Sequence, residues 1–187
     1  MGTGLDLPDW AVVTPERATH IARVAALVDG WAAARSVSRA EAARWHRAAI
    51  LHDALRDAGA EVLARYTSQD GWPAKLWHGP AAAAAAEQHG DTDAGVLDAV
   101  RYHSVGWATW DDAGRMLFLA DYLDPGRPHE RAERESLATR VPTEPDAVMR
   151  EVLRRRVAWL VERGKPIRRE TWELWNRLAA ADSSSSD

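Results

Sequence analysis

The chain has 187 residues, of which 46% are hydrophobic and 28% are charged, with a formal net charge of -4 and no cysteine. This length and composition fit one folded domain with a substantial core and exclude an intrinsically disordered chain. The net charge excludes a general electrostatic attraction to nucleic acid or to an anionic membrane, and the missing cysteines exclude disulfides and thiolate metal sites, as expected of a protein in a reducing cytoplasm.

Residues 1–13 are expected to form an N-terminal extension, which lacks the basic start and the apolar run of a signal peptide. No apolar stretch of the sequence reaches transmembrane length. Apolar residues then recur at helical spacing, and alternating strand patterns are absent, which predicts an all-α fold. The predicted fold is a single helical bundle over residues 14–181, followed by a disordered serine-rich tail at 182–187.

In the first half of the chain, N-cap residues predict where the helices begin. Thr14 before Pro15 is a cap followed by proline at the first helical position. Ser38 with Glu41 forms a capping box for a second helix. This second helix is expected to end at about His52-Asp53. A short helix around 58–66 and a loop at 67–73 follow it.

The second half predicts five further helices from caps and helix-breaking residues. The first carries Ala81–Ala86, has His78 at its start and ends at Gly90, and the second is capped by Asp91 or Thr92 and ends near Gly106. The third is started by Asp111 or Asp112 and carries Asp121. The fourth follows Thr143 and ends at Gly164, and the fifth lies around 170–180.

Six histidine and aspartate side chains from five separated segments form a set of metal-binding type. Imidazoles and carboxylates are ligands that iron, manganese and zinc prefer, and the chain offers no thiolate instead. Each residue alone is more simply explained as a hydrogen-bonded core residue, but the six together favour a two-metal hydrolase. The predicted ligands are His20, His52, Asp53, His78, His103 and Asp121.

Two of these carboxylates are predicted to be buried. Asp53 follows the apolar helix end Ala48–Leu51, and Asp121 follows the apolar stretch Leu117–Ala120. An unpaired buried carboxylate costs several kcal/mol, which a bound metal would offset. The remaining histidines are expected to lie outside the site, because they fall on another side of a helix, at a helix C-terminus or in a polar stretch; they are His46, His89 and His129.

Five motifs surround the predicted ligands: Arg17-x-x-His20-x-x-Arg23-Val24, Ile50-Leu51-His52-Asp53, Trp77-His78-Gly79-Pro80, Tyr102-His103-Ser104-x-Gly106 and Leu119-Ala120-Asp121-Tyr122-x-Asp124-Pro125-Gly126-Arg127. They resemble the HD-domain phosphohydrolase superfamily and, within it, the YqeK family of symmetrical diadenosine tetraphosphatases, over residues 14–176. The resemblance implies a helical HD fold that binds two metal ions, usually iron, with manganese or another first-row metal as the alternative. It also implies that Asp53 bridges both ions and that His78 and His103 mark a dinuclear member.

The same resemblance implies symmetrical hydrolysis of diadenosine tetraphosphate, a small dinucleoside polyphosphate, to two ADP by a metal-bridging hydroxide that Asp53 orients. Because the phosphate chain carries several negative charges, we expect cationic side chains near the metals. Aromatic residues near the predicted ligands are candidates for stacking on adenine. The expected substrate contacts are Arg56, Arg115, Arg127, Ser104 and Tyr122, with Trp107 and Trp110 as further stacking candidates.

Four residues depart from the family pattern and leave the substrate preference open: Arg56 and Arg115 replace lysines, Ser104 replaces a threonine and Asp124 replaces a glutamate. One alternative function is therefore that of another HD-type nucleotide phosphohydrolase, such as a nucleotidase or a phosphodiesterase. A second alternative is a non-catalytic nucleotide-binding module, whose expected mark is a missing ligand, and none of the six is missing. The sequence leaves the oligomeric state open, a homodimer included.

Overall fold

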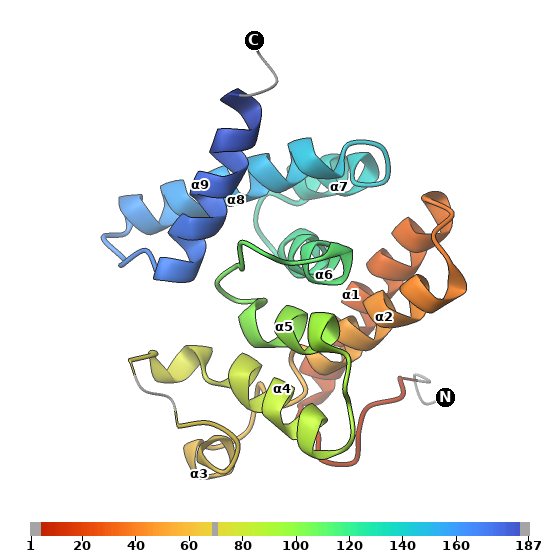
Figure 1. Ribbon diagram of the computed structural model, residues 1–187, viewed down its shortest axis with the longest axis vertical. Helices are drawn as coiled ribbons and strands as arrows, with labels where there is room; N and C mark the ends of the chain where they lie inside the picture. The colour runs from red at the N-terminus through yellow and green to blue at the C-terminus, as the bar shows by residue number, and fades with distance from the viewer. Residues whose placement is uncertain (1–4, 69–70, 184–187) are drawn as a thin grey trace.

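The computed structural model describes residues 5–68 and 71–183, and every regular element within these ranges is helical (Figure 1). The predicted all-α class is confirmed. The elements are α1 (Pro15–Ala34), α2 (Arg39–Leu51), α3 (Ala60–Ala64), the short 3-10 helix η1 (Ala74–Leu76), α4 (His78–Gln88), α5 (Ala94–Tyr102), α6 (Asp112–Leu123), α7 (Arg131–Arg140), α8 (Pro145–Glu162) and α9 (Arg169–Ser183). None of these helices has the length and apolar character that crossing a membrane would need.

Helix α6 lies at the centre of the bundle. It packs against α1, α2, α5, α7 and α8, and its residues Met116–Ala120 are all buried. Helices α1 and α2 form a hairpin beside it, and α4 lies against α5 (Figure 1). Helices α8 and α9 pack together at the opposite end from α4. Because α6 packs against so many helices, its last turn faces side chains from distant parts of the sequence.

The first two helices begin where the sequence predicts. The Thr14 side chain accepts a hydrogen bond from the Arg17 backbone N–H at 3.3 Å, and Pro15 opens α1. The Ser38 hydroxyl accepts from the Glu41 backbone N–H at 3.1 Å. The Glu41 carboxylate does not return to Ser38, because it accepts hydrogen bonds from the Trp45 and Arg44 side chains instead. Half of the predicted capping box is therefore present.

The cap of α5 differs from the prediction. Asp93, rather than Asp91 or Thr92, precedes the helix, and its carboxylate accepts from the Val96 backbone N–H at 3.1 Å. Asp91 is buried, where it accepts from the Asp93 backbone N–H and pairs with Arg47. Asp93 therefore caps helix α5, and Asp91 stabilises the turn before it.

The predictions are also incomplete at the C-terminal end. Helix α7 was not predicted because it is almost entirely polar, and only Leu137 among its residues is buried. Helix α9 continues to Ser183, two residues into the tail predicted at 182–187. Residues 184–187 of that tail lie outside the described residues.

The predicted N-terminal extension packs against the helical domain over its described part, residues 5–13. The Val12 backbone N–H donates to the Ala54 carbonyl at 2.7 Å, and the Val12 carbonyl accepts from the Asp57 N–H at 3.3 Å. Trp10 and Val13 also pack against the core. This segment therefore supports the turn after α2, which carries His52 and Asp53.

Candidate metal centre

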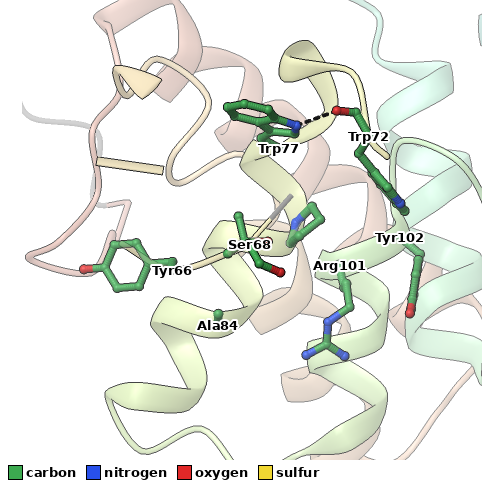
Figure 2. A pocket seen from close by; sticks show the side chains of 9 residues that line it. Tyr66, Ser68, Trp72, Trp77, Ala84, Arg101 and Tyr102 are labelled. Atoms are coloured by element: carbon green, nitrogen blue, oxygen red, sulfur yellow. Dashed lines mark hydrogen bonds between the residues drawn. The ribbon is translucent and has the colours of Figure 1, made fainter. Parts of the chain in front are cut away.

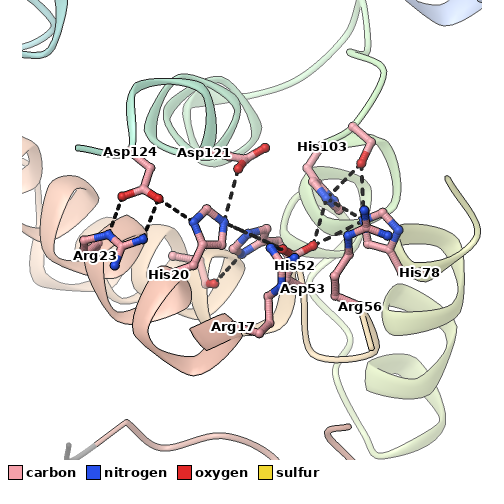
Figure 3. Close-up of polar contacts among 12 residues, drawn as sticks. Arg17, His20, Arg23, His52, Asp53, Arg56, His78, His103, Asp121 and Asp124 are labelled. Carbon is pink, nitrogen blue, oxygen red and sulfur yellow. Dashed lines mark hydrogen bonds and ion pairs between the residues drawn. The ribbon is translucent and has the colours of Figure 1, made fainter. Parts of the chain in front are cut away.

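All six predicted ligands converge on one site inside the bundle (Figure 3). They come from the N-terminal half of α1, the end of α2, the start of α4, the end of α5 and the last turn of α6. In that order the side chains are His20, the pair His52 and Asp53, His78, His103 and Asp121. Five helices thus bring together residues that span about a hundred positions of sequence.

The cluster divides into two groups of three, each with its ligand atoms within 4.8 Å of one another: His20, His52 and Asp121, and Asp53, His78 and His103. The Asp53 carboxylate lies between them. Its Oδ1 atom is 3.2 Å from His78 Nε2 and 3.5 Å from His103 Nε2. Its Oδ2 atom is 3.7 Å from His20 Nε2 and 3.6 Å from His52 Nε2. The two oxygens of one carboxylate therefore face both groups.

The outer nitrogens of three of these imidazoles are fixed by the backbone. Each Nδ1 atom donates to the carbonyl three residues earlier, at 2.7 Å for His52, 3.1 Å for His78 and 2.8 Å for His103. A carbonyl only accepts, so the proton must be on Nδ1. In the neutral ring the Nε2 lone pair then points into the cluster, which is the orientation a metal ligand needs.

This arrangement places like lone pairs opposite each other. His78 Nε2 and His103 Nε2, both with inward lone pairs, are 3.1 Å apart. Two unprotonated nitrogens at such distances repel each other unless a cation or a proton lies nearby. The donor set thus fits two metal ions by its chemistry and by its inward orientation.

The surroundings keep two of the rings neutral. Burial lowers the pKa of His52 to about 4, although Asp53 acts in the opposite direction. Burial also lowers the pKa of His78 below its ordinary value. Neutral imidazole is the form that binds a metal. These two side chains are therefore ready to bind a cation at neutral pH.

The aspartates stay ionised, and His20 behaves differently from the other histidines. Burial acts to raise the pKa of Asp53, but the neighbouring histidines, His52 above all, hold it well below its ordinary value. Burial acts to lower the pKa of His20, yet hydrogen bonds to Asp121 and Asp124 outweigh it and raise the value to about 9. The cluster therefore combines the two anionic carboxylates of Asp53 and Asp121 with the neutral imidazoles of His52 and His78.

A second layer of charged residues orients the cluster. Asp124 Oδ2 lies 2.7 Å from His20 Nδ1, and Arg23 holds the same carboxylate with two hydrogen bonds of 2.6 and 2.9 Å. The Arg17 Nη1 atom donates to Asp53 Oδ2 at 2.7 Å. The motifs contained these residues, but no role was predicted for them. The available signal was the spacing of three, which separates Arg17 and Arg23 from His20 and Asp124 from Asp121, because such residues share one helix face.

A cavity of about 410 Å³ opens beside the cluster. Asp53, Asp121, His78 and His103 form part of its wall. Seven cationic side chains also line it: Arg17, Arg56, Lys75, Arg127, Arg156, Lys165 and Arg168. The cavity is therefore strongly cationic although the whole chain has a net charge of -4.

Three of the expected substrate contacts line this cavity: Arg56, Arg127 and Ser104. The Arg127 guanidinium donates to the Asp121 carboxylate at 2.5 Å and to the Asp121 carbonyl at 2.9 Å. The Ser104 hydroxyl lies 3.0 Å from His103 Nε2. Arg127 and Ser104 therefore contact the predicted metal ligands directly.

The other two expected contacts, Arg115 and Tyr122, do not line this cavity. Arg115 instead pairs with Asp146 and lies 3.5 Å from Asp112. One face of the Tyr122 ring is covered by the Arg134 guanidinium, 4.4 Å from the ring centre. Contact of Arg115 and Tyr122 with substrate therefore stays a prediction.

The two tryptophans considered for stacking also lie elsewhere. Trp110 is buried against Phe118 and donates to the Asp98 carbonyl at 3.1 Å. The Trp107 ring is stacked on Tyr102, with ring centres 4.2 Å apart. Neither residue lines the cationic cavity.

A separate cavity of about 400 Å³ lies between the segment after α3, helix α4 and helix α5 (Figure 2). It is lined by aromatic residues, Tyr66, Trp72, Trp77 and Tyr102, together with Arg101 and smaller side chains. The predicted metal ligands do not line it. Arg168 lies between the two cavities, since it lines the cationic one and its guanidinium sits 4.9 Å from the centre of the Trp72 ring.

Comparison with known proteins assigns the fold and the cluster to a family. The HD domain matches residues 17–126, which is more than half of the chain and includes all six clustered residues. The chain belongs to the HD-domain family. HD domains bind divalent metal ions, and the two groups of ligands in this HD domain have the composition to hold them.

Three curated relatives carry the name symmetrical bis(5'-nucleosyl)-tetraphosphatase. The protein of Bacillus subtilis is 23% identical over 141 residues, which are 71% of this chain and 75% of that protein. The protein of Halalkalibacterium halodurans is 29% identical over 56% of this chain and 55% of its own length. The protein of Staphylococcus aureus is 32% identical over 43% of this chain and 45% of its own length. The last two matches thus span about half of each relative.

A solved structure shares the fold almost completely. It is a protein of Clostridium acetobutylicum named as a predicted HD superfamily hydrolase involved in NAD metabolism. The TM-score is 0.78 at 18% identity, over 90% of this chain and 92% of that one. Because 90% of this chain is covered, the match extends well beyond residue 126, and most of the chain after that residue belongs to the shared architecture.

Proposed function

We propose that this HD-domain hydrolase is a dinuclear metal-dependent phosphohydrolase that splits diadenosine tetraphosphate symmetrically into two ADP. The observation that carries the proposal is the inward orientation of the cluster, in which His78 Nε2 and His103 Nε2 meet at 3.1 Å with their outer nitrogens held by carbonyls. The names of the three relatives support the substrate.

Each group of three clustered residues would hold one ion, and Asp53 would contact both because its two oxygens face different groups. When bound, two such ions supply Lewis acidity, lowering the pKa of a water molecule and neutralising charge on the phosphoryl group. We propose iron as the resident metal, with manganese as the alternative.

The protein's own residues position the reacting parts. Arg17 holds the Asp53 carboxylate and Asp124 holds the His20 ring, so two side chains of the cluster are fixed before substrate arrives. Arg127 is anchored to Asp121 at the edge of the cavity. Such fixed groups lower the cost of organising the site during the reaction.

The charge of the cavity favours a polyanionic substrate. Its lining includes seven cations but only two carboxylates, Asp53 and Asp121, and bound metal ions would add further positive charge. A chain of four phosphates complements this excess, whereas a single phosphate would leave most of the cations without a partner. Ser104 and Arg56 complete the proposed phosphate contacts from the wall beside His103 and His78.

Symmetrical cleavage requires that a bond to the oxygen between the two central phosphorus atoms breaks. Water oxygen adds to one of the two central phosphorus atoms, and the oxygen that bridges the two central phosphorus atoms leaves with the other half of the molecule. Each half is then ADP, and the reaction releases two protons in total once the new terminal phosphate of each ADP is fully ionised.

The test is product chromatography after incubation of anaerobically purified protein with diadenosine tetraphosphate. ADP as the sole nucleotide product is the expected result. AMP plus ATP would show asymmetrical cleavage and refute the assignment. Turnover of nucleoside monophosphates or cyclic nucleotides without turnover of the dinucleotide would identify another type of HD phosphohydrolase, and nucleotide binding without turnover of any of them would identify a non-catalytic module.

A further inference from the structure

Arg156 lies on α8, thirty positions beyond the segment that the HD domain matches. Its side chain nevertheless reaches the cationic cavity beside the cluster. The Nη2 atom donates to the Ser104 carbonyl, and the hydroxyl of the same serine is 3.0 Å from His103 Nε2. Arg156, which lies outside the matched segment, thus contacts Ser104, the residue that follows the predicted metal ligand His103.

The Arg156 guanidinium lacks a countercharge among the described residues. Its Nε atom is buried without a hydrogen-bond partner, and no carboxylate of the described chain forms an ion pair with it. Burial lowers the pKa of Arg156 below its ordinary value, which reflects the cost of keeping this charge away from water. The neighbouring arginines differ, because Arg154 and Arg155 are both paired with Glu151.

Other cations of the cavity already have partners. Arg127 is bound to Asp121, and Arg17 is bound to Asp53. Arg168 donates to the Gly71 carbonyl at 2.8 Å and lies over the Trp72 ring. Arg156 therefore has a carbonyl contact but no carboxylate partner. Arg56 also donates only to a carbonyl, that of Lys75 at 3.4 Å, but of the two arginines it is Arg156 that has a buried nitrogen without a hydrogen-bond partner. A buried charge without a partner is costly, and a ligand of opposite charge would offset that cost.

We propose that Arg156 binds phosphate oxygens of the ligand that occupies this cavity, so that α8 adds a phosphate-binding residue to the HD site. The planar guanidinium offers Nε and a neighbouring Nη donor in the geometry that matches two phosphate oxygens, while its bond to the Ser104 carbonyl keeps it in place. The inference rests on the proposed function for the identity of the ligand as a polyphosphate.

The test measures the binding of inorganic tripolyphosphate to the metal-loaded full chain by calorimetry at constant salt. The variants are Arg156→Met, Arg156→Lys and the matched control Arg154→Met, which removes an exposed arginine of the same helix. We expect Arg156→Met to weaken binding roughly 10- to 100-fold, Arg156→Lys to recover part of the loss and Arg154→Met to bind like wild type. Elemental analysis should find the same metal content in all four proteins.

Two results would overturn the proposal. One is tripolyphosphate binding by Arg156→Met that equals wild-type binding. The other is a loss of metal in Arg156→Met that matches the loss of affinity, because the arginine would then only support Ser104 and His103. A wild-type enzyme that fails to release ADP from diadenosine tetraphosphate would refute the proposed function instead, and the tripolyphosphate measurement would still decide the role of Arg156.

Discussion

His78 and His103 face each other with their Nε2 atoms 3.1 Å apart, although 25 positions separate them in the sequence. Gly79 makes this approach of α4 to α5 feasible. A Cβ atom at Gly79 would lie 3.0 Å from the carbonyl oxygens of Val100 and Arg101 and 3.2 Å from the His103 ring. Gly79 therefore allows the close contact of α4 and α5, the two helices that carry the predicted metal ligands His78 and His103.

Gly79→Ala should push α4 away from α5 and separate the two imidazoles. The obstacle is backbone, which cannot move aside as a flexible side chain can. We expect a loss of about 1–3 kcal/mol in the free energy of unfolding and a fall in bound metal, measured by denaturant unfolding and elemental analysis. Gly30→Ala in α1 is the control, because no atom lies within 4 Å of its added Cβ. Unchanged metal content in Gly79→Ala would contradict this view of the contact.

Asp53→Ala should abolish hydrolysis and lower the metal content. The substitution removes the carboxylate whose oxygens face four imidazoles, so neither group of ligands stays complete. His89→Ala should change neither property, since this exposed ring contacts only the Ala85 carbonyl of its own helix and the Trp10 ring. Activity assays and elemental analysis measure both effects, and equal losses in the two variants would mean that the site is misassigned.

Metal binding should stabilise the folded protein. A ligand that binds only the folded state adds about 3 kcal/mol when present at a hundred times its dissociation constant. For a chain of this size that corresponds to a rise of roughly 5–10 °C in the melting temperature, measured by calorimetry before and after chelation. The shift should be much smaller in Asp53→Ala. An equal shift in this variant would place the stabilising ion outside the cluster.

Arg44 should contribute to stability by joining three helices. Its guanidinium donates to Glu41 of its own helix, to Asp93 at the start of α5 and to Asp111 at the start of α6. Arg44→Met should therefore lower the free energy of unfolding by about 1–2 kcal/mol near neutral pH. Arg65→Met, which removes one exposed pair with Glu61, should cost less than about 0.5 kcal/mol.

The effect of Arg44 should depend on pH in a defined direction. Its hydrogen bonds hold the pKa of Asp93 below the ordinary value of 3.8. A carboxyl group whose pKa is lower in the folded state stabilises the protein above the unfolded value, and this contribution is lost as the pH falls. Wild type and Arg44→Met should thus converge in stability below pH 3.8. A difference that grows on acidification would contradict this assignment.

The sequence predicted best the features that local rules control. The Thr14 and Ser38 caps follow from hydrogen bonding within one turn. The six clustered residues were predictable because a carboxylate at the end of an apolar stretch needs a partner. Asp53 is buried as predicted, whereas Asp121 is only partly buried. Helix α7 escaped prediction because its polar sequence contains almost no apolar period.

The substrate contacts were less predictable because they depend on how distant helices pack. Arg115 was expected among the cationic side chains near the metals, six positions before Asp121. Six residues along a helix rotate a side chain by about 120°, however, so Arg115 faces Asp146 instead. Arg156 could not be predicted, because only the packing of α8 against α6 brings it to the cavity.

The path of α8 and α9 over the cavity has a consequence for how such enzymes diversify. The residues proposed to perform the chemistry lie within positions 17–126, while Arg156, Lys165 and Arg168 approach from a later part of the chain. Changes in the later part can therefore alter which ligands fit without disturbing the metal-binding end. Part of the selectivity is thus encoded in a stretch of the polypeptide that holds none of the clustered residues, and natural variation there can act while the metal-binding residues stay constant.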